Sequence, residues 1–226
     1  MPPKVYIACV ETYAAQMPEV FRASRTAIIE EHPVRYRQPR DRLLHQLGLR
    51  MAAAQLSPAE ATHLTVVRGR YGKPYFKEFP HFAFNISHSG SYVVCAVHEH
   101  PVGVDLQEQT LLERDSWHLF LSPQEAEVCP DSDQALLLWS AKEAVSKYTG
   151  NGFMRPLPEL GILPKRNPNP LFIGKEHLFL WQWRFRCQYI LTLCTPSEQP
   201  PQIEPFSVER YLNRHVKNGT VRKEIP

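Results

Sequence analysis

The chain has 226 residues, of which 43% are hydrophobic and 22% charged, and its formal net charge is +3. This is the composition of a soluble globular protein, long enough for one domain or for two fused half-size units. No apolar run reaches the roughly 18 residues of a membrane span, no long apolar segment marks a secretory signal, and the modest charge does not favour a nucleic-acid binder.

The cysteines form an odd set without the CxxC spacing typical of zinc sites. All except Cys129 lie in apolar runs, as small reduced core residues do, the others being Cys9, Cys95, Cys187 and Cys194. These features predict a cytoplasmic protein without structural zinc.

The first half of the chain predicts several strands and one long helix. MPPKVYIACV is typical of a strand, and Asp41 is expected to cap a helix over about 42–55. Its apolar face would consist of Leu43, Leu47, Met51 and Ala54. Ser57-Pro58-Ala59-Glu60 then matches a capping box at the start of another helix. Strands are expected at about 82–88, 92–98 and 102–106.

The second half predicts a helix followed by a hairpin. Ser122-Pro123-Gln124-Glu125 repeats the capping box, so we interpret both of these glutamates first as helix-start residues. A helix over about 133–148 should end at Gly150. The five prolines of 156–170 predict irregular structure, and LFLWQWRFRCQYILTLCT predicts a hairpin. TPSEQPPQIEP reads as a linker before a short helix and a loose tail.

Strands and helices mix without strict βαβ alternation, which favours the α+β class. Each half gives a helix followed by a β-meander, although no internal sequence repeat proves a duplication. We expect an N-terminal half over 1–108, a C-terminal half over 109–201 and a tail over 202–226.

Positive charge is concentrated in two segments. HPVRYRQPRDR contains four arginines, and the residues from Phe206 onward carry five Lys/Arg against two Glu. Such clusters suit phosphates or an acidic protein partner, while a solvated face is the alternative. The four arginines are Arg35, Arg37, Arg40 and Arg42.

The strand VGVDLQ places Asp105 and Gln107 on one face with Gly103, opposite the core face of Val102, Val104 and Leu106. Gly103 would leave space beside the aspartate. A carboxylate and an amide oxygen two residues apart can both approach one hard cation. The alternative is an aspartate that begins a turn.

The helix LLLWSAKEAVSKYTG places Trp139, Glu143 and Lys147 opposite an apolar stripe. Glu143 and Lys147 have the spacing of an ion pair, which on an exposed face would contribute only a few tenths of a kcal/mol. A tryptophan on this polar face indicates that the face borders another structural unit or a ligand. The stripe consists of Leu137, Ala141, Ala144, Val145 and Tyr148.

FNISHSG places Asn85, Ser87 and Ser89 on one face of a strand and His88 on the other. Hydroxyls and an imidazole near a hairpin corner can form a phosphate cradle. Alternatively, Asn85 and Ser87 satisfy local backbone groups and His88 is a half-exposed ring.

Taken in order and at their spacings, RYGKPYF, FNISHSG, VGVDLQ and WSAKEAVSK resemble the successive motifs of the phosphopantetheinyl transferases. Among these, the chain is similar to the monomeric Sfp-type enzymes, over about 35–152 in motifs and over the remainder only in layout. The resemblance implies a pseudo-twofold α+β fold with the active site in the cleft between halves.

The implied reaction is Mg²⁺-dependent transfer of 4′-phosphopantetheine from coenzyme A to a serine of an apo acyl or peptidyl carrier protein. Adenosine 3′,5′-bisphosphate would be released. By resemblance, Asp105, Gln107 and Glu143 are the metal positions. Glu143 would also accept the serine proton, and Lys147 would neutralise the phosphoryl group.

The resemblance further implies a phosphate and nucleotide side. Ser87, His88 and Ser89 would contact phosphate oxygens, and Lys73 would lie beside the nucleotide. Arg40 and Arg42 would bind the 3′-phosphate.

Gln107 departs from the family pattern, which has an acid at this position. Glu108 follows, but strand alternation turns it to the opposite face unless a bulge intervenes. Because Mg²⁺ tolerates amide and water ligands, we predict retained activity with weaker metal binding or an altered metal preference.

Two other classes of function are weighed. A degenerate module that binds coenzyme A or a carrier without turnover would explain Gln107, but the intact Asp105, Glu143 and Lys147 oppose it. A nucleic-acid binder has only the arginine cluster in its favour. An acidic carrier also predicts a basic rim, at Arg210, Arg214 and Lys217 or at Lys165-Arg166.

Overall fold

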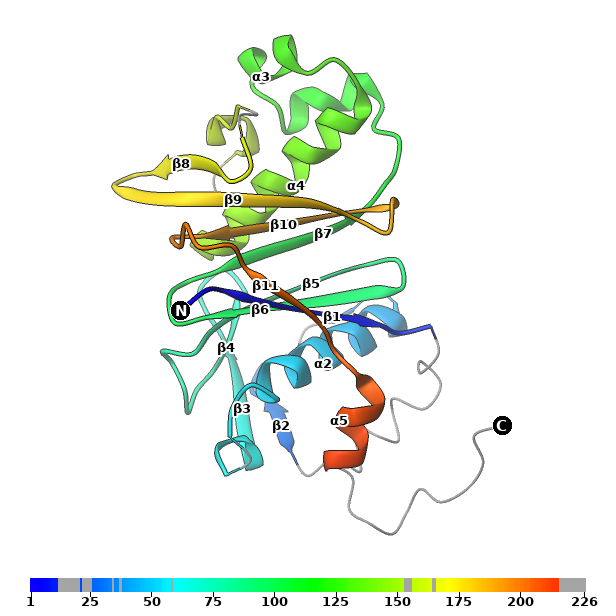
Figure 1. The fold of residues 1–226 in the computed structure, drawn as a ribbon, viewed down its shortest axis with the longest axis vertical. Coiled ribbons are helices and arrows are strands. Elements are labelled where there is room, and N and C mark those ends of the chain that lie inside the picture. The colour runs from blue at the N-terminus through cyan, green and yellow to red at the C-terminus, as the bar shows by residue number, and fades with distance from the viewer. Residues whose placement is uncertain are drawn as a thin grey trace.

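The computed structural model describes residues 1–11, 21, 26–33, 35–36, 38–57, 59–152, 156–163 and 166–215. It consists of two halves stacked along the long axis of the molecule, each with a four-stranded sheet and one long helix (Figure 1). This arrangement confirms the α+β class. None of the described helices is both long and apolar enough to cross a membrane.

The N-terminal half is organised around a sheet with the strand order β11-β1-β6-β5. The hairpin of β5 and β6 has the predicted position, with Ser89 paired to Tyr92 across its turn. β1 lies antiparallel to β6 and parallel to β11. The bounds are β1 Lys4–Cys9, β5 Ala83–Ser89, β6 Tyr92–His98 and β11 Gln202–Pro205.

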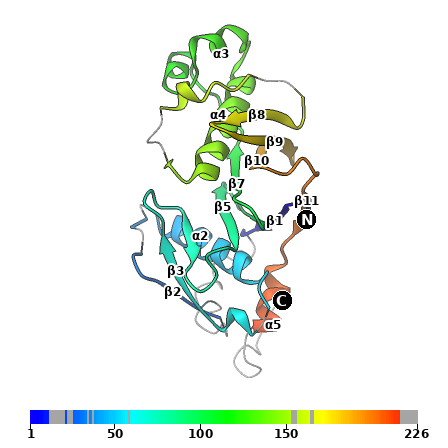
Figure 2. The same cartoon turned by 90° about the vertical axis from the view of Figure 1, so that its left-hand side faces the viewer.

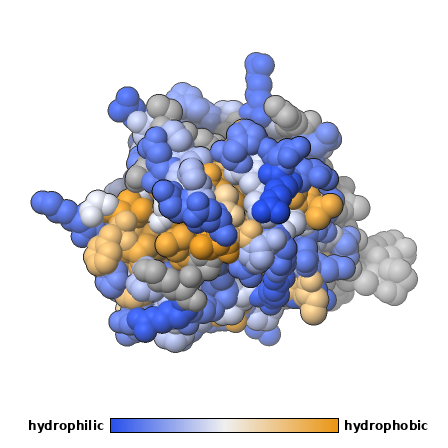
Figure 3. All heavy atoms as spheres, turned by 90° about the horizontal axis from the view of Figure 1, so that it is seen from above, coloured by the Kyte–Doolittle hydropathy of each residue, from blue (hydrophilic) through white to orange (hydrophobic). Residues whose placement is uncertain are grey.

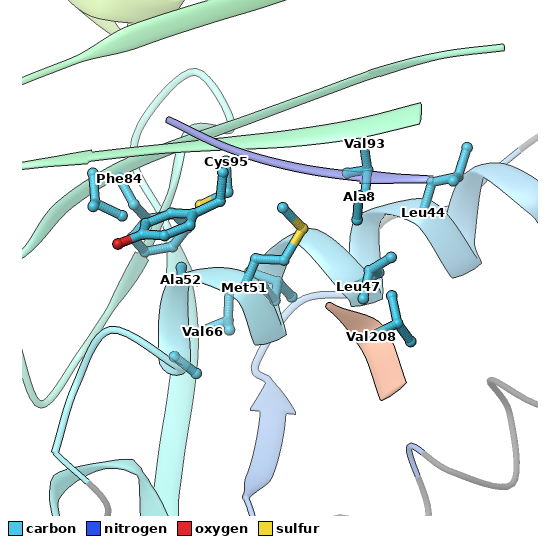
Figure 4. Packing of buried hydrophobic residues seen from close by; sticks show 14 of the residues in the cluster. Ala8, Leu44, Leu47, Met51, Ala52, Val66, Phe84, Val93, Cys95 and Val208 are labelled. Carbon is cyan, nitrogen blue, oxygen red and sulfur yellow. The ribbon is translucent and has the colours of Figure 1, made fainter. Parts of the chain in front are cut away.

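Helix α2 (Pro39–Ala53) packs on one face of this sheet, where its side chains interlock with those of the strands (Figure 4). Leu47 and Met51 are fully buried, and Gly48 is close enough to Ile86 of β5 that a Cβ would overlap it. The helix begins earlier than predicted: Gln38 is the N-cap, and Asp41 lies in the first turn. Because Pro39 fits the first helical position, it extends the helix toward the arginine cluster.

A smaller sheet with the order β2-β3-β4 covers the outer side of this half. The predicted capping box at Ser57 and Glu60 forms both of its hydrogen bonds, but it precedes only a 3₁₀ turn. The bounds are β2 Ala27–Glu30, η1 Glu60–Thr62, β3 His63–Arg68 and β4 Pro74–Phe76.

The C-terminal half has the strand order β7-β10-β9-β8, with α4 (Ser132–Thr149) lying across one face. As predicted, α4 ends at Gly150, whose φ of +68° is the left-handed conformation that glycine adopts without steric cost. The bounds of the strands are β7 Gly103–Glu108, β8 Asn169–Ile173, β9 Glu176–Phe185 and β10 Tyr189–Thr195.

The predicted capping box at Ser122 and Glu125 is formed at the start of α3 (Pro123–Val128). Glu125 is also fully buried, where it accepts a 2.7 Å bond from the ammonium of Lys142. This pair ties α3 to α4. The remaining short elements are η2 Arg114–Leu119 and η4 Leu157–Leu160.

The two large sheets pack against each other through a shared apolar layer. Val5, Val94 and Ala96 of the N-terminal sheet meet Val104 and Leu191 of the C-terminal sheet. The edge strands β5 and β7 run side by side where the halves meet (Figures 1 and 2). The halves are therefore joined by a continuous core.

The segment interpreted as a linker contains a strand, which corrects that interpretation. β11 adds to the N-terminal sheet beside β1, and α5 (Val208–His215) follows it. Val208 and Tyr211 are 3% and 4% exposed, and Val208 belongs to the N-terminal core. The end of the described chain thus packs as part of the first half.

Hydrophobic side chains also reach the surface at the end of the molecule formed by the C-terminal half (Figure 3). Hydrophilic side chains separate the apolar areas in this view. The large hydrophobic residues of this half that are most exposed are Leu111, Leu119, Val128, Leu163 and Phe172.

Candidate active site

Three polar side chains of β5 join the two halves. Asn85 Oδ1 accepts from Val104 N at 2.8 Å, Ser87 Oγ from Leu106 N at 3.1 Å, and Ser89 Oγ from Glu108 N at 2.9 Å. These amides lie at the edge of β7 that faces away from β10. The backbone-satisfying alternative is therefore correct in kind, but the partners are in the other half.

Asp105 lies at the centre of this junction and is 4% exposed. Its Oδ1 accepts from Lys147 Nζ at 2.6 Å and Ser87 Oγ at 3.2 Å, and its Oδ2 accepts from Ser140 Oγ at 2.9 Å. The expectation that Asp105 lies on a non-core face with space beside it is wrong. Gly103 does not leave space beside Asp105, because α4 occupies it at Ala144 and Tyr148.

Lys147 does not form the expected ion pair with Glu143. Its ammonium binds Asp105 and Ser87 Oγ, the latter at 2.9 Å, and so bridges the halves. Glu143 has no hydrogen bond or ion pair among the described residues. Burial raises the pKa of Glu143 to about 7, with Lys147 opposing the rise and the Asp105 carboxylate adding to it.

His88 lies on the α2 side of β5, as alternation predicts. Burial lowers the pKa of His88; Asp41 counteracts this effect, and the positive charges of Lys147 and Arg40 lower the pKa further. An imidazole of the N-terminal half therefore shares its electrostatic environment with Lys147 of the C-terminal half. A neutral ring at pH 7 can donate or accept one hydrogen bond at the junction.

The residues predicted to bind the nucleotide of coenzyme A lie at different places in the structure. Arg40 donates to Gly90 O at 2.8 Å and to Ser91 Oγ at 3.4 Å, so it is held against the hairpin turn beside His88. Arg42 is exposed on the same helix. Arg37 lies outside the described residues.

The Lys73 ammonium binds two backbone carbonyls and does not lie on an open surface. Its ammonium donates to Val102 O at 2.9 Å and to Tyr148 O at 3.1 Å, and burial lowers its pKa to about 8. Tyr148 is in the last turn of α4, one residue after Lys147. Lys73 thus ties the Gly72-Lys73-Pro74 turn to the helix that carries Glu143 and Lys147.

The strand register settles the geometry around Gln107. β7 pairs with β10 without a bulge, with Gln107 opposite Ile190 and Glu108 opposite Tyr189. Glu108 is bound by the Tyr189 hydroxyl at 3.2 Å on the face away from Asp105. Gln107 Nε2 donates to Glu108 O at 3.3 Å, a bond that does not use its amide oxygen.

The residues present fit a hard divalent cation. Asp105 and Glu143 are close enough that the charge of one raises the pKa of the other, and the Glu143 carboxyl has no protein donor in the described chain. With Gln107 they offer oxygen ligands only, which suit Mg²⁺. The described residues contain no group of three His, Cys, Asp or Glu side chains placed for a metal.

Several residues of this region were missed or misinterpreted from the sequence. Ser140 lies within the quoted helix motif but received no role, although it binds Asp105. Trp139 packs edge-to-face on Phe120 and against the core of its own half, and it stays partly exposed. Of the predicted basic rim, Arg210 and Arg166 are exposed, whereas Lys165, Lys217 and the Arg214 side chain lie outside the described residues.

Comparisons with known proteins agree with this arrangement. A model of the 4′-phosphopantetheinyl transferase superfamily matches residues 101–200, and a model described as 4′-phosphopantetheinyl transferase, N-terminal, matches residues 24–100. Together the two models cover both sides of the junction.

Curated relatives carry the same description. A 4′-phosphopantetheinyl transferase of Bacillus subtilis is 32% identical over 161 residues, covering 67% of this chain and 72% of that protein. The transferase Sfp of Bacillus subtilis (strain 168) is 34% identical over 98 residues, 41% of this chain and 44% of the relative. The transferase psf-1 of Bacillus pumilus is 39% identical over 87 residues, 36% and 37% of the two chains. The chain therefore belongs to the 4′-phosphopantetheinyl transferase superfamily of enzymes.

Proposed function

We propose that this protein transfers the 4′-phosphopantetheine group of coenzyme A to a serine of an apo carrier protein. The proposal rests on the junction between the two halves. There, His88 of the first half shares one electrostatic environment with Lys147 of the second, and Lys147 binds Asp105. A diphosphate needs such positive charge and hydrogen-bond donors, and a serine nucleophile needs a nearby base.

In the proposed reaction the serine oxygen forms a bond to the phosphorus that carries the pantetheine arm. The bond from that phosphorus to the bridging oxygen breaks, and adenosine 3′,5′-bisphosphate leaves. Glu143 accepts the serine proton, a role that suits a carboxylate whose pKa is raised to about 7. Lys147 neutralises charge on the transferred phosphoryl group.

The phosphate side is formed by His88 and Ser89, whose hydroxyl accepts from Glu108 N and retains its proton for a phosphate oxygen. Ser87 takes a positioning role in this proposal. Its oxygen already accepts from Leu106 N and Lys147 Nζ while it donates to Asp105. Arg40 and Arg42 are the proposed contacts of the 3′-phosphate, and Lys73 supports α4 beside the nucleotide.

Mg²⁺ would be held by Asp105 and Glu143, with Gln107 as a third oxygen donor, and would neutralise the diphosphate. In the structure Lys147 Nζ donates a hydrogen bond to Asp105 Oδ1 at 2.6 Å. A cation held at this oxygen would replace the ammonium there, and Lys147 would then be available to the phosphoryl group.

We further propose that the enzyme acts as a monomer in the cytoplasm. One chain supplies both sides of the junction, which supports a monomer. The five cysteines are free thiols, which supports a reducing compartment. The proposed partner is an acyl or peptidyl carrier protein, and neither membrane nor nucleic acid is required.

Mass spectrometry of an apo carrier protein incubated with coenzyme A and Mg²⁺ tests the function. We expect the carrier to gain the mass of one phosphopantetheine. Glu143→Gln should abolish this gain while coenzyme A binding, followed by calorimetry, persists. A wild-type chain that binds coenzyme A but modifies no member of a panel of apo carriers would instead be a binding module.

A further inference from the structure

A row of hydrogen bonds leads from Gln182 of β9 to Asp105 of β7 across the face of the C-terminal sheet on which α4 packs. Gln182 Nε2 lies 3.0 Å from Thr192 Oγ1, Thr192 Oγ1 lies 2.8 Å from Ser140 Oγ, and Ser140 Oγ lies 2.9 Å from Asp105 Oδ2. The four residues come from β9, β10, α4 and β7, which are neighbours in the C-terminal half (Figure 1). Ser140 and Thr192 are both 0% exposed.

The direction of every bond in this row is determined by chemistry. Gln182 Nε2 also donates to the carbonyl of Leu137 at 3.0 Å, which can only accept. The Gln182 amide nitrogen therefore faces Thr192, whose oxygen must accept. The Thr192 proton is then available only for Ser140 Oγ, and the Ser140 proton goes to the Asp105 carboxylate.

This one-way row gives the two oxygens of Asp105 different roles. Oδ2 is held in the protein interior by Ser140, whereas Oδ1 faces Lys147 and Ser87 at the junction. A carboxylate that was free to rotate about its terminal torsion would hold neither oxygen in a fixed direction. The row fixes the plane of the carboxylate, because one oxygen must accept from the Ser140 hydroxyl, and the other oxygen then faces the junction.

We propose that Ser140, Thr192 and Gln182 are positioning residues that hold the Asp105 carboxylate so that only Oδ1 is presented to a divalent cation. This inference rests on the proposed function, in which Asp105 is a metal ligand. It assigns a role to the serine of the WSAKE segment and to two residues of a hairpin that contains no catalytic group. Groups behind a metal ligand commonly contribute about 10- to 100-fold to metal affinity.

The same burial suggests an alternative, that the hydroxyls only stabilise the fold. The two roles differ in what Thr192→Val and Thr192→Ser do. Valine has almost the same shape as threonine but breaks the row, whereas serine loses a methyl group and keeps it. If Thr192→Val weakens metal binding and Thr192→Ser does not, the affinity depends on the hydroxyl and not on the packing. That result indicates a positioning role.

The test measures binding of Mn²⁺ by electron paramagnetic resonance, with coenzyme A present and no carrier protein, so that no turnover occurs. We expect Thr192→Val and Ser140→Ala to weaken Mn²⁺ binding about tenfold or more. Thr192→Ser should bind within about twofold of wild type. Thr195→Val is the matched control, because Thr195 is also 0% exposed on β10 but its hydroxyl accepts from Ser197 N instead.

Thermal unfolding of each variant shows whether it folds, and Ser140→Ala removes so little volume that it serves if Thr192→Val does not. Folded Thr192→Val and Ser140→Ala proteins that bind Mn²⁺ like wild type would overturn the inference. The carrier assay on the wild-type chain separates this result from a failure of the proposed function. A wild-type chain that neither modifies a carrier nor binds Mn²⁺ overturns both.

Discussion

Asp105 receives hydrogen bonds from both halves of the molecule, from Ser87 on one side and from Ser140 and Lys147 on the other. Burying a carboxylate is costly unless its oxygens are satisfied, and here three donors provide that satisfaction. Glu143, one turn before Lys147, lacks such donors in the described chain. The pair thus combines one fixed carboxylate with one that is available to a cation or a proton.

A first prediction concerns Lys73. Burial lowers its pKa from 10.5 to about 8, so the folded protein binds this proton less tightly than the unfolded chain does. The contribution of Lys73 to the free energy of unfolding should therefore rise with pH between these two values, by at most about 1.4 kcal/mol per pH unit. We expect the stability difference between wild type and Lys73→Met, from urea unfolding, to be larger at about pH 9.5 than at about pH 7.

Lys77→Met is the control for Lys73, since Lys77 is an exposed lysine paired with Glu31. Its stability difference from wild type should not rise over the same pH range. A difference that stays flat for Lys73→Met as well would contradict a buried ammonium tied to Val102 and Tyr148.

A second prediction concerns Gln107. Gln107→Glu adds a negative charge on the Asp105 face of β7, and more ligand charge strengthens binding of a hard cation. We expect the Mg²⁺ concentration for half-maximal transfer to fall by about threefold to tenfold. Gln109→Glu adds the same charge two residues further on and should leave that concentration unchanged. An unchanged Mg²⁺ dependence in Gln107→Glu would remove Gln107 from the ligand set.

At the scale of single residues, the sequence predicted the strand face on which a side chain lies better than the partner that the side chain binds. Alternation placed Ser87 and His88 on opposite faces and Glu108 away from Asp105, and the structure agrees. The spacing of Glu143 and Lys147 suggested an ion pair that is absent, because Asp105 offers the ammonium a better-enclosed partner from another strand. Ser140 and Thr192 could not be predicted, since a buried hydroxyl leaves no mark in local periodicity.

Among the elements, the contact of α4 with β7 determines where the chemistry lies. Gly103 permits this contact, because a side chain there would meet the backbone of Ala144 and Tyr148. The close approach brings Lys147 of the helix within 2.6 Å of Asp105 on the strand. One glycine therefore sets the separation of helix and strand.

A third prediction follows from this contact. Gly103→Ala should lower the free energy of unfolding by about 2 kcal/mol or more, since neither backbone group can move without displacing α4. It should also reduce transfer activity more than stability alone explains, because Lys147 and Glu143 move away from Asp105. Urea unfolding and the carrier assay measure the two effects. Gly69→Ala, where the nearest atom is 3.7 Å away, should change neither.

Elements with strong local signals were predicted well. The β5–β6 hairpin, the end of α4 at Gly150 and the hairpin of β9 and β10 have the expected places, since turn residues and caps act over a few positions. β11 was missed for the opposite reason. Its four residues include two that strands usually avoid, Glu204 and Pro205, and only the distant β1 stabilises them as a strand.

In the molecule as a whole, the C-terminal half is inserted between strands of the N-terminal sheet. The chain leaves that sheet after β6, builds the second half, and returns as β11 beside β1. Lys4 thus pairs with Gln202. The two halves have separate sheets, but the chain passes from the first half into the second and then back into the first.

A fourth prediction tests this path. A chain ended after Glu198 loses β11 and α5, so β1 becomes an open edge and the core loses Val208. We expect a lower midpoint of thermal unfolding and more aggregation than for wild type, measured by calorimetry and light scattering. A chain ended after His215 keeps both elements and should match wild type. Equal behaviour of the two shortened chains would show that β11 contributes little.

The return of β11 also has a consequence for synthesis on the ribosome. β1 is translated about two hundred residues before β11, its outer neighbour in the sheet. Until then one border of the nascent sheet stays uncovered, and a chaperone has time to bind it. The sheet of the N-terminal half is therefore completed only after the whole C-terminal half has been translated.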